Sequence, residues 1–412
     1  MMVKLLAIMP LLPYPPYQGT NIRNFNLIKH LAKNYRIHLL CFYENPDQLV
    51  EAKPLWELCE LVEAIPAPAH PFTRRLALLF LSRLPDMAFR KFSPLFQKRL
   101  ENLLHEHQYE LVHVEGIEMA RYGLWMAAQK RPRPGLVFGD QNAEYLLQKR
   151  AFETDIRQPR YWPAAFYSLI QWKKLARYEA QVCRTFDRVV AVSEADKEAL
   201  RKLVPGLRVA VVPNGVDVDY YAQFVPGKPP LEGWSPYALV FTGRMDFRPN
   251  VDAALWFAEE ILPRIRARFP QAHFYVVGQS PHPRLSTLYG RSDVTVTGFV
   301  EDVRPYIASA AVYVVPIRIG GGTRLKVLEA MAMRKAVVST SLGCEGFPVM
   351  DKTHLVVADT PDSFAEAVCE LLADEGKRTQ LGEEAFRFVD ANYRWEHIVP
   401  RLEEVYRELL QR

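Results

Sequence analysis

The stretch from Ala311 to Gly346 constrains the fold more than any other part of this 412-residue chain. The apolar, β-branched run 311–316 has the pattern of a strand buried on both faces, and a second such run follows at the end of the stretch. Between the two runs lie three consecutive glycines, 320–322, and a segment with helical apolar spacing, predicted to begin at Thr323. A strand, loop, helix and strand in this order predict a parallel, doubly wound α/β sheet.

The glycine loop has the features of an anion-binding site. Glycines let the backbone approach a ligand with its N–H groups outward, and a helix N-terminus favours negative charge. Arg324 and Lys326, placed in the first turn and a half of the predicted helix, would oppose its dipole unless an external anion such as a diphosphate compensates them. Glu329, about one turn further, offers a carboxylate to sugar hydroxyls. A generic turn with solvated charges is the alternative, because glycine loops are common and this one is not a Walker loop.

This segment resembles the donor-nucleotide region of retaining glycosyltransferases with the two-domain GT-B fold, in the large family called group 1 or family 4. It is most similar to the branch that reads GGGTRxKxLE, found among exopolysaccharide and PEP-CTERM-associated sugar transferases. The resemblance implies that Glu329 binds the donor ribose and that the backbone of Gly322, Thr323 and Arg324 cradles the diphosphate. Many members carry an earlier glutamate that touches the transferred sugar, and Gly321 stands at that donor-binding position here.

The composition indicates a globular protein of two domains. The residues are 49% apolar and 24% charged, and 412 residues exceed one ordinary core. A net charge of +5 allows anionic ligands or an acidic membrane surface, while the lack of a Lys/Arg block or nucleic-acid motif argues against nucleic acid. Five scattered cysteines without a CxxC pair predict a reduced, cytoplasmic protein and no metal site. We expect a first strand rather than a signal peptide at the start, and no apolar run approaches the roughly 20 residues that cross a bilayer.

The domain boundaries are predicted from composition and from the resemblance. We expect an N-terminal, acceptor-side Rossmann-like domain at 1–225 and a nucleotide-sugar-binding Rossmann-like domain at 237–392. The stretch 226–236 between them is rich in proline and glycine and is the predicted linker. The resemblance implies that the last helix, within 393–412, completes the first domain, and that the two domains face an interdomain cleft.

Several candidate residues of the first domain follow predicted strands, at the sheet edge where ligands of doubly wound folds bind. Gly19 ends the loop after the first strand; it is either a structural turn or, as the resemblance implies, a donor contact. His113 matches the first position of a family His-x-His, and Glu115 replaces the second, both on the acceptor side. Asp140 stands where many members have a histidine near the reacting centre. It could accept a hydrogen bond from a sugar hydroxyl, or only cap the next helix.

In the second domain, Arg244 directly follows a predicted strand and glycine. The resemblance implies that it holds the donor diphosphate, and the planar fork of an arginine suits paired phosphate oxygens. The lysine expected about six residues later is Asn250 in this chain. We expect Lys326, or Arg324, to supply the missing charge from the glycine loop.

The segment 72–99 mixes a dense apolar run with several arginines and lysines. One interpretation is an amphipathic, basic segment that lies on an anionic membrane, where a lipid-linked acceptor would be found. The other is a core helix with a solvated face, which is the more common use of such a pattern.

The resemblance implies a glycosyltransferase of polysaccharide or glycolipid biosynthesis. It would move a sugar from a UDP- or GDP-linked donor to a hydroxyl of a saccharide or lipid-linked acceptor, with retention at the anomeric carbon and no further cofactor. A GT-B nucleotide-sugar epimerase is one alternative. A catalytically silent sugar-nucleotide-binding protein is another, suggested by the missing glutamate and histidine.

Overall fold

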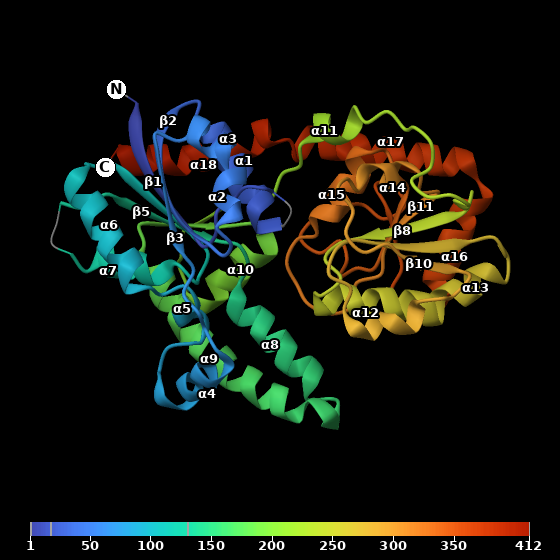
Figure 1. The fold of residues 1–412 in the computed structure, drawn as a ribbon, viewed down its shortest axis with the longest axis horizontal. Coiled ribbons are helices and arrows are strands. Elements are labelled where there is room, and N and C mark those ends of the chain that lie inside the picture. The colour runs from blue at the N-terminus through green and yellow to red at the C-terminus, as the bar shows by residue number, and fades with distance from the viewer. Residues whose placement is uncertain (1, 17–18, 130–131, 412) are drawn as a thin grey trace. The chain divides into compact units, whose positions relative to one another are not determined.

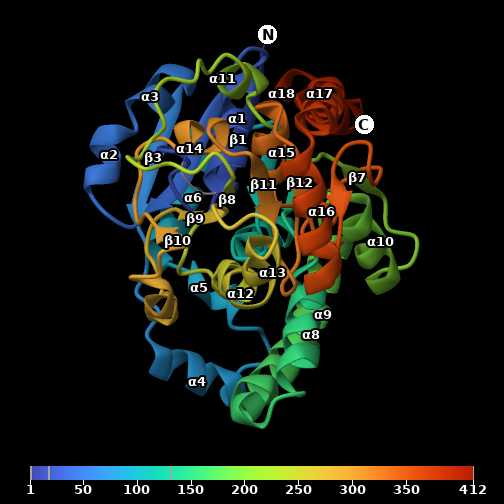
Figure 2. The ribbon, with the colours of Figure 1, turned by 90° about the vertical axis from the view of Figure 1, so that its right-hand side faces the viewer.

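A computed structural model of the chain describes most of its residues and resolves two compact units. The described residues, apart from the side chains of Phe72, Arg74 and Leu76, are 2–16, 19–129 and 132–411. Each unit is a parallel sheet with helices on both faces, as the sequence predicts (Figures 1 and 2). The two units are Met1–Asn214 with Trp395–Arg412, and Gly215–Arg394.

The first unit is built on a seven-stranded parallel sheet. Its central strands are buried on both faces, because helices cover each side and apolar clusters fill both layers. In spatial order the strands are β3 (Leu61–Pro66), β2 (Tyr35–Tyr43), β1 (Val3–Met9), β4 (Leu111–Glu115), β5 (Gly135–Asp140), β6 (Arg188–Ala191) and β7 (Val209–Val211). The helices are α1 (Gly19–Leu31), α2 (Asp47–Glu51), α3 (Lys53–Leu58), α4 (Phe72–Leu81), α5 (Met87–Arg90), α6 (Pro94–Glu106), α7 (Ala120–Ala127), α8 (Glu144–Asp155), α9 (Trp162–Thr185), α10 (Glu194–Leu203) and α18 (Trp395–Leu410).

The second unit has a six-stranded parallel sheet around one continuous apolar cluster. Its strands, in spatial order, are β10 (Val294–Val296), β9 (His273–Val277), β8 (Ala238–Thr242), β11 (Val312–Val315), β12 (Val337–Ser339) and β13 (Val356–Val357). Its helices are α11 (Val218–Ala222), α12 (Arg248–Trp256), α13 (Leu262–Arg266), α14 (Arg304–Ala308), α15 (Leu325–Ala332), α16 (Pro361–Ala373) and α17 (Glu375–Asn392). The strand β11, the glycine loop and α15 therefore form the central β-α unit of this sheet.

The structure moves the predicted domain boundary. The second unit begins at Gly215, ahead of the stretch 226–236 that the sequence predicts as a linker. In that stretch, Trp234 stacks on Tyr275 with ring centroids 3.8 Å apart, and its indole N–H donates to the Ser309 carbonyl at 2.9 Å. These contacts correct the linker prediction, because the proline- and glycine-rich stretch packs as part of the second unit. The first unit accordingly ends before residue 225 and takes in α18.

A buried charged network ties the elements of the first unit together. Arg23 on α1, 2% exposed, donates its Nε–H to Glu115 Oε1 at 3.1 Å, and Glu115 itself is fully buried. Arg23 Nη1 also donates to the carbonyls of Val212 and Pro213. Burial alone would raise the pKa of Glu115, but the guanidinium and a hydrogen bond from His113 lower it to about 2. The ion pair of Arg23 and Glu115 therefore joins α1 to β4, and the further hydrogen bonds of Arg23 join α1 to the loop after β7.

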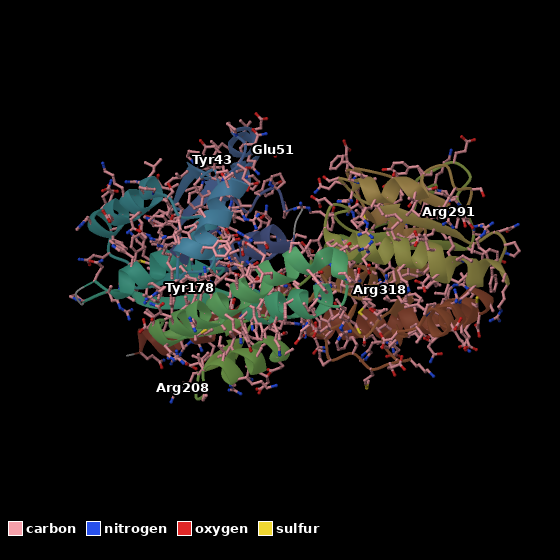
Figure 3. All side chains as sticks on the ribbon, turned by 90° about the horizontal axis from the view of Figure 1, so that it is seen from below. Tyr43, Glu51, Tyr178, Arg208, Arg291 and Arg318 are labelled. Carbon is pink, nitrogen blue, oxygen red and sulfur yellow. The ribbon has the colours of Figure 1, made fainter. Side chains whose placement is uncertain are left out.

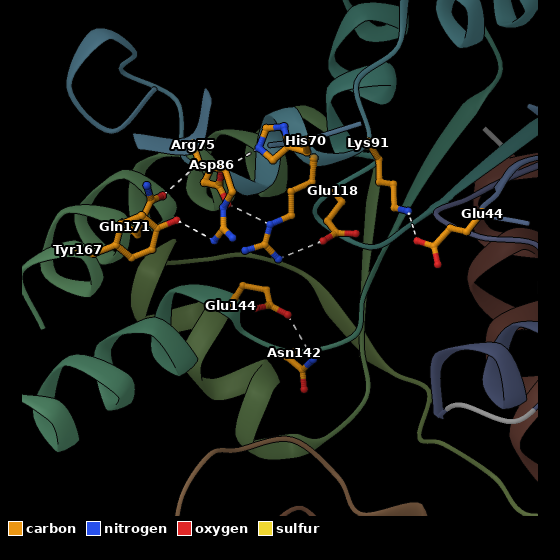
Figure 4. A network of polar contacts seen from close by, with 11 residues as sticks. Glu44, His70, Arg75, Asp86, Lys91, Glu118, Asn142, Glu144, Tyr167 and Gln171 are labelled. Carbon is orange, nitrogen blue, oxygen red and sulfur yellow. Dashed lines mark hydrogen bonds and ion pairs between the residues drawn. The ribbon is translucent and has the colours of Figure 1, made fainter. Parts of the chain in front are cut away.

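A second buried carboxylate fixes the segment 72–99 (Figure 4). Asp86, 2% exposed, accepts from Arg75 Nε at 3.2 Å and Arg90 Nε at 3.1 Å, and His70 Nε2 lies 2.9 Å from it. The Asp86 N–H donates to the side-chain oxygen of Gln171 on α9 at 2.9 Å. Two of the arginines that made this segment look basic therefore bind a carboxylate inside the unit. Among the described residues, none of the helices is both long and apolar enough to cross a bilayer.

Glu115→Gln is expected to lower the free energy of unfolding by roughly 3 kcal/mol at pH 7, because it leaves the buried Arg23 without its counter-charge. Since folding lowers the pKa of Glu115 from 4.5 to about 2, this contribution is complete above pH 4.5 and fades as the pH falls toward 2. Urea unfolding followed by circular dichroism measures the difference.

The matched control is Glu408→Gln. Glu408 lies on α18, and its carboxylate is 2.9 Å from the guanidinium of Arg188 on β6. Glu408 is 53% exposed, so its loss is expected to cost less than about 1 kcal/mol. Equal losses in the two variants would contradict the role given to the Arg23–Glu115 pair.

Candidate functional site

The glycine loop joins β11 to α15, but the helix begins later than the sequence predicts. Gly320 and Gly322 have φ of +96° and +79°, a left-handed conformation that only glycine adopts without strain. Arg324 is extended, with φ −102° and ψ 93°, and α15 starts at Leu325 rather than at Thr323. Thr323 and Arg324 therefore belong to the loop, because the left-handed glycine just before them turns the backbone away from a helical path.

Arg324 folds back over this loop. Its Nη1–H donates to the Gly321 carbonyl at 2.5 Å. Arg324 is the N-cap residue of α15, and its side chain makes no capping hydrogen bond to the helix among the described residues. The first turn of α15 also contains no acidic residue. The first N–H groups of a helix have no partner within it, so this end of α15 remains suited to an anion.

Lys326, in the first turn of α15, reaches the residues that follow β8. Its Nζ donates to Asn250 Oδ1 at 3.0 Å and lies 4.0 Å from the ring centroid of Phe241. The Asn250 side-chain amide in turn donates to the Arg244 carbonyl at 2.8 Å. Gly243 has a φ of +149°, which residues with a side chain rarely adopt, and a Cβ there would lie 2.6 Å from the Lys326 Nζ and push the amine aside. The structure thus brings Lys326 to the position after β8 where a lysine is expected and Asn250 stands.

The surroundings of Lys326 disfavour its charge. Burial and, to a smaller extent, the neighbouring Arg324 lower the pKa of the amine to about 7, against an opposing effect of Glu329. The amine therefore loses its proton far more readily than the amine of an exposed lysine. A polyanion bound beside the amine would stabilise its ammonium form and raise its pKa.

The backbone carbonyl of Arg244 is linked to the Lys326 amine through Asn250. The guanidinium of Arg244 binds Asp246 instead. The guanidinium forms a paired contact with Asp246, with Nε–Oδ1 at 3.1 Å and Nη2–Oδ2 at 2.6 Å. The side chain is 43% exposed, and exposed pairs of this kind are weak. A phosphate group can therefore compete with Asp246 for the guanidinium without a large loss of stability.

Glu329, the predicted ribose ligand, is held by a residue that the sequence did not single out. The hydroxyl of Tyr221 on α11 hydrogen-bonds the Glu329 carboxylate. Burial raises the pKa of Glu329, while Tyr221 and Lys326 act to lower it. No motif marks Tyr221, because α11 is far from α15 in the sequence and only the fold brings the two helices together. Gly321 supplies the carbonyl to Arg324 and has no side chain to offer a sugar.

In the first unit, His113 and Glu115 are buried and engaged within the unit. His113 Nε2 lies 2.6 Å from Glu115 Oε2, and the other ring nitrogen lies 2.7 Å from the Tyr406 hydroxyl on α18. Gln141 donates to the remaining Glu115 oxygen at 3.2 Å. These contacts hold the sheet to α18, so the acceptor-side role of the two residues stays a prediction. Gly19 is the exposed first residue of α1.

Asp140, at the end of β5, sits in a cluster of carboxyl groups. It is 2% exposed, and burial together with Glu179 raises its pKa well above the usual value. Glu179, whose own pKa rises to about 8, accepts the backbone N–H groups of Glu144 and Tyr145 at 2.9 Å each. The sequence suggests that Asp140 is an acceptor for a sugar hydroxyl or a helix cap. Neither carboxyl oxygen of Asp140 has a hydrogen-bond partner among the described residues, so its role toward a sugar stays a prediction. The N–H groups at the start of α8 bind Glu179, so the helix-cap alternative for Asp140 is wrong.

Comparison with known proteins agrees with this geometry. A family model described as Glycosyltransferase Family 4 matches residues 17–220, and one described as Glycosyl transferases group 1 matches residues 236–374. Each model matches less than half of the chain, but together they span most of it, and both describe glycosyltransferases. The chain is therefore similar to group 1 glycosyltransferases along most of its length and has the GT-B fold.

Individual relatives match the sequence or the fold. A phosphatidyl-myo-inositol mannosyltransferase of Mycobacterium tuberculosis is 30% identical over 209 residues, 47% of this chain and 53% of that protein. The match thus spans about half the length of the phosphatidyl-myo-inositol mannosyltransferases to which the chain is similar. A sucrose-phosphate synthase of Thermosynechococcus elongatus has a similar fold, with a TM-score of 0.74 at 19% identity over 99% of both chains. Anabaena HepE, solved with UDP and glucose, has a TM-score of 0.67 at 16% identity, covering 99% of this chain and 100% of that one.

The lowered pKa of Lys326 predicts that nucleotide binding takes up a proton. At pH 8.5 the free amine is mostly neutral, and a bound diphosphate is expected to restore its charge. Titration calorimetry with UDP and with GDP, in two buffers of different ionisation enthalpy, should show uptake of close to one proton. The Kd of the nucleotide should rise by up to about tenfold per pH unit above pH 7.

In Lys326→Met the proton uptake should disappear and binding should weaken. The matched control is Lys377→Met, on α17, because Lys377 is 59% exposed and 3.9 Å from its partner Glu370. Proton uptake that persists in Lys326→Met, or that is absent from the unaltered protein, would exclude Lys326 as the group that binds the diphosphate.

Proposed function

We propose that the chain transfers a sugar from a UDP- or GDP-linked donor to an acceptor hydroxyl, with retention of the anomeric configuration. The observation that carries this proposal is the junction of Lys326, Asn250 and Arg244 beside the glycine loop. Two loops from different β-α units bring a lysine and an arginine to one edge of the second sheet. That edge is where doubly wound folds bind nucleotides.

The diphosphate is proposed to lie against the loop residues Gly322, Thr323 and Arg324. There it meets the uncapped start of α15, with Lys326 in the first turn. The ribose hydroxyls then reach Glu329, whose carboxylate Tyr221 orients. Anabaena HepE was solved with UDP, which supports a nucleotide of this size in such a fold.

These contacts favour departure of the nucleoside diphosphate. Negative charge grows on the leaving phosphate as the glycosidic bond breaks, and positioned cations stabilise that charge more than they stabilise the ground state. Arg244 and Lys326 are the proposed cations. The leaving phosphate then serves as the base that accepts the proton of the acceptor hydroxyl on the same face of the sugar, which gives retention.

The acceptor is proposed to be a lipid-linked or saccharide hydroxyl in polysaccharide or glycolipid biosynthesis. The relative in M. tuberculosis is named for transfer of mannose to phosphatidyl-myo-inositol, a lipid. A lipid acceptor would bring the protein into peripheral contact with an anionic membrane on the cytoplasmic side. His113, Glu115 and Asp140 remain the proposed residues of the first unit near this chemistry.

Arg244→Ala and Lys326→Ala are each expected to lower kcat/KM by roughly 10²-fold, the scale of losing one positioned charge in the transition state. The assay measures nucleotide release from UDP- and GDP-sugars with a glycolipid acceptor. The matched control is Arg264→Ala, because Arg264 on α13 is 45% exposed and pairs at 2.7 Å with Asp362 on α16.

Unchanged activity in both variants would remove the diphosphate assignment. The same reactions separate the alternatives. An isomer of the donor sugar formed without acceptor would identify an epimerase, and tight nucleotide binding without any turnover would identify a silent binding protein.

A further inference from the structure

The helices α8 and α9 form an antiparallel hairpin that extends from the first sheet. Phe152 and Trp172 stack across the two helices, with ring centroids 6.2 Å apart and an angle of 21° between the rings. The hairpin turns at the short 3₁₀ segment Pro159–Tyr161. In Figures 1 and 2 its far end lies away from the sheet of its own unit, at the same end as α4, and Figure 3 looks onto it from below, with Tyr178 labelled on α9.

The far end of the hairpin exposes large apolar side chains. Ile156, Trp162 and Phe166 are 45%, 57% and 55% exposed. The indole N–H of Trp162 donates to the Ile156 carbonyl at 3.3 Å, so the exposed ring presents mainly apolar surface. We name Ile156, Arg157, Arg160, Trp162 and Phe166 the hairpin tip.

Positive charge is concentrated on the same hairpin. Arg157 and Arg160 of the hairpin tip are exposed. Within residues 146–178 the acidic residues are Glu153 and Asp155, and Asp155 is buried, so it adds no negative charge to the surface. Residues 146–178 contain seven basic and two acidic residues, an excess equal to the net charge of +5 of the whole chain: Lys149, Arg150, Arg157, Arg160, Lys173, Lys174 and Arg177 against Glu153 and Asp155.

The segment 72–99, for which the sequence allows a membrane contact, pairs several of its cations within the first unit. Arg75 and Arg90 bind Asp86, and Arg99 pairs with Glu63 at 2.6 Å, so these cations are used inside the unit. Lys174 of α9 donates to the Leu78 and Leu79 carbonyls at the end of α4, which fixes α4 to the hairpin. The segment therefore supports the hairpin, and its exposed end adds apolar surface through Phe80 and Leu81, 66% and 85% exposed.

We propose that the hairpin tip docks on an anionic lipid bilayer. Tryptophan and phenylalanine favour the membrane–water interface, and the surrounding arginines are attracted to anionic head groups. Exposed aromatic rings flanked by the exposed Arg157 and Arg160 match such a surface better than they match a second protein, which would have to neutralise that charge. The inference rests on the proposed lipid-linked acceptor, but its test needs neither donor nor acceptor, so the two can fail separately.

The test is co-sedimentation of the full chain with vesicles of phosphatidylcholine alone and of phosphatidylcholine with 30% phosphatidylglycerol. The chain is expected to bind the anionic vesicles and to dissociate as salt is added. Trp162→Ala with Phe166→Ala should lower the partition coefficient by about tenfold or more, because less apolar area enters the interface. Arg157→Glu with Arg160→Glu should lower it by a similar factor on anionic vesicles.

The matched controls lie elsewhere on the first unit. Trp56→Ala removes an indole that is 45% exposed on α3, and Arg201→Glu with Lys202→Glu reverses two charges at the end of α10. Both should bind like the unaltered chain, and thermal melting should show that every variant is folded. Absence of binding, or equal losses in tip and control variants, would overturn the proposal. So would a dimer in lipid-free solution that the tip variants dissociate, because the partner would then be a second copy of the chain.

Discussion

The hydrogen bond between the Lys326 amine and the Asn250 amide is the interaction on which the site in the second unit depends. It joins α12, the helix after β8, to α15, the helix after β11, at 3.0 Å. The Asn250 amide also donates to the carbonyl of Arg244, in the loop between β8 and α12. Position 243 favours glycine because its φ is +149°, and a Cβ there would also displace the Lys326 amine. Gly243, Asn250 and the start of α15 therefore meet at one partly buried amine.

In this arrangement the positive charge expected at position 250 is supplied by a lysine from a different helix. The resemblance predicts a lysine at position 250, and the chain has an asparagine there. The amine arrives instead from α15, and Asn250 orients it. Holding an amine where burial lowers its pKa to about 7 opposes stability, because the folded state disfavours the charged form. The first unit does the reverse with Arg23 and Glu115, whose buried charges neutralise each other and stabilise the fold.

The parts of the structure that follow from local pattern were predictable. Alternating runs of buried strands and helices predict two parallel sheets, and the glycine triplet predicts the loop between β11 and α15. The start of α15 was misplaced because helical spacing continues through Thr323, whereas the left-handed Gly322 moves the helix start to Leu325. Tyr221 and Glu179 could not be found from the sequence, since their partners lie on other elements and no motif spacing connects them. The sequence leaves two interpretations of the basic segment 72–99 open for a related reason: the carboxylates that bind Arg75, Arg90 and Arg99 can be identified only once the chain is folded.

The central claim is that the Lys326 ammonium contacts the diphosphate of a sugar nucleotide beside the glycine loop. The most direct measurement is a crystal structure of the chain with UDP or GDP bound. The account predicts phosphate oxygens within hydrogen-bond distance of the Lys326 Nζ and of the backbone N–H groups at Gly322–Arg324, with the ribose at Glu329. A nucleotide bound elsewhere, with Lys326 still bonded only to Asn250, would contradict it.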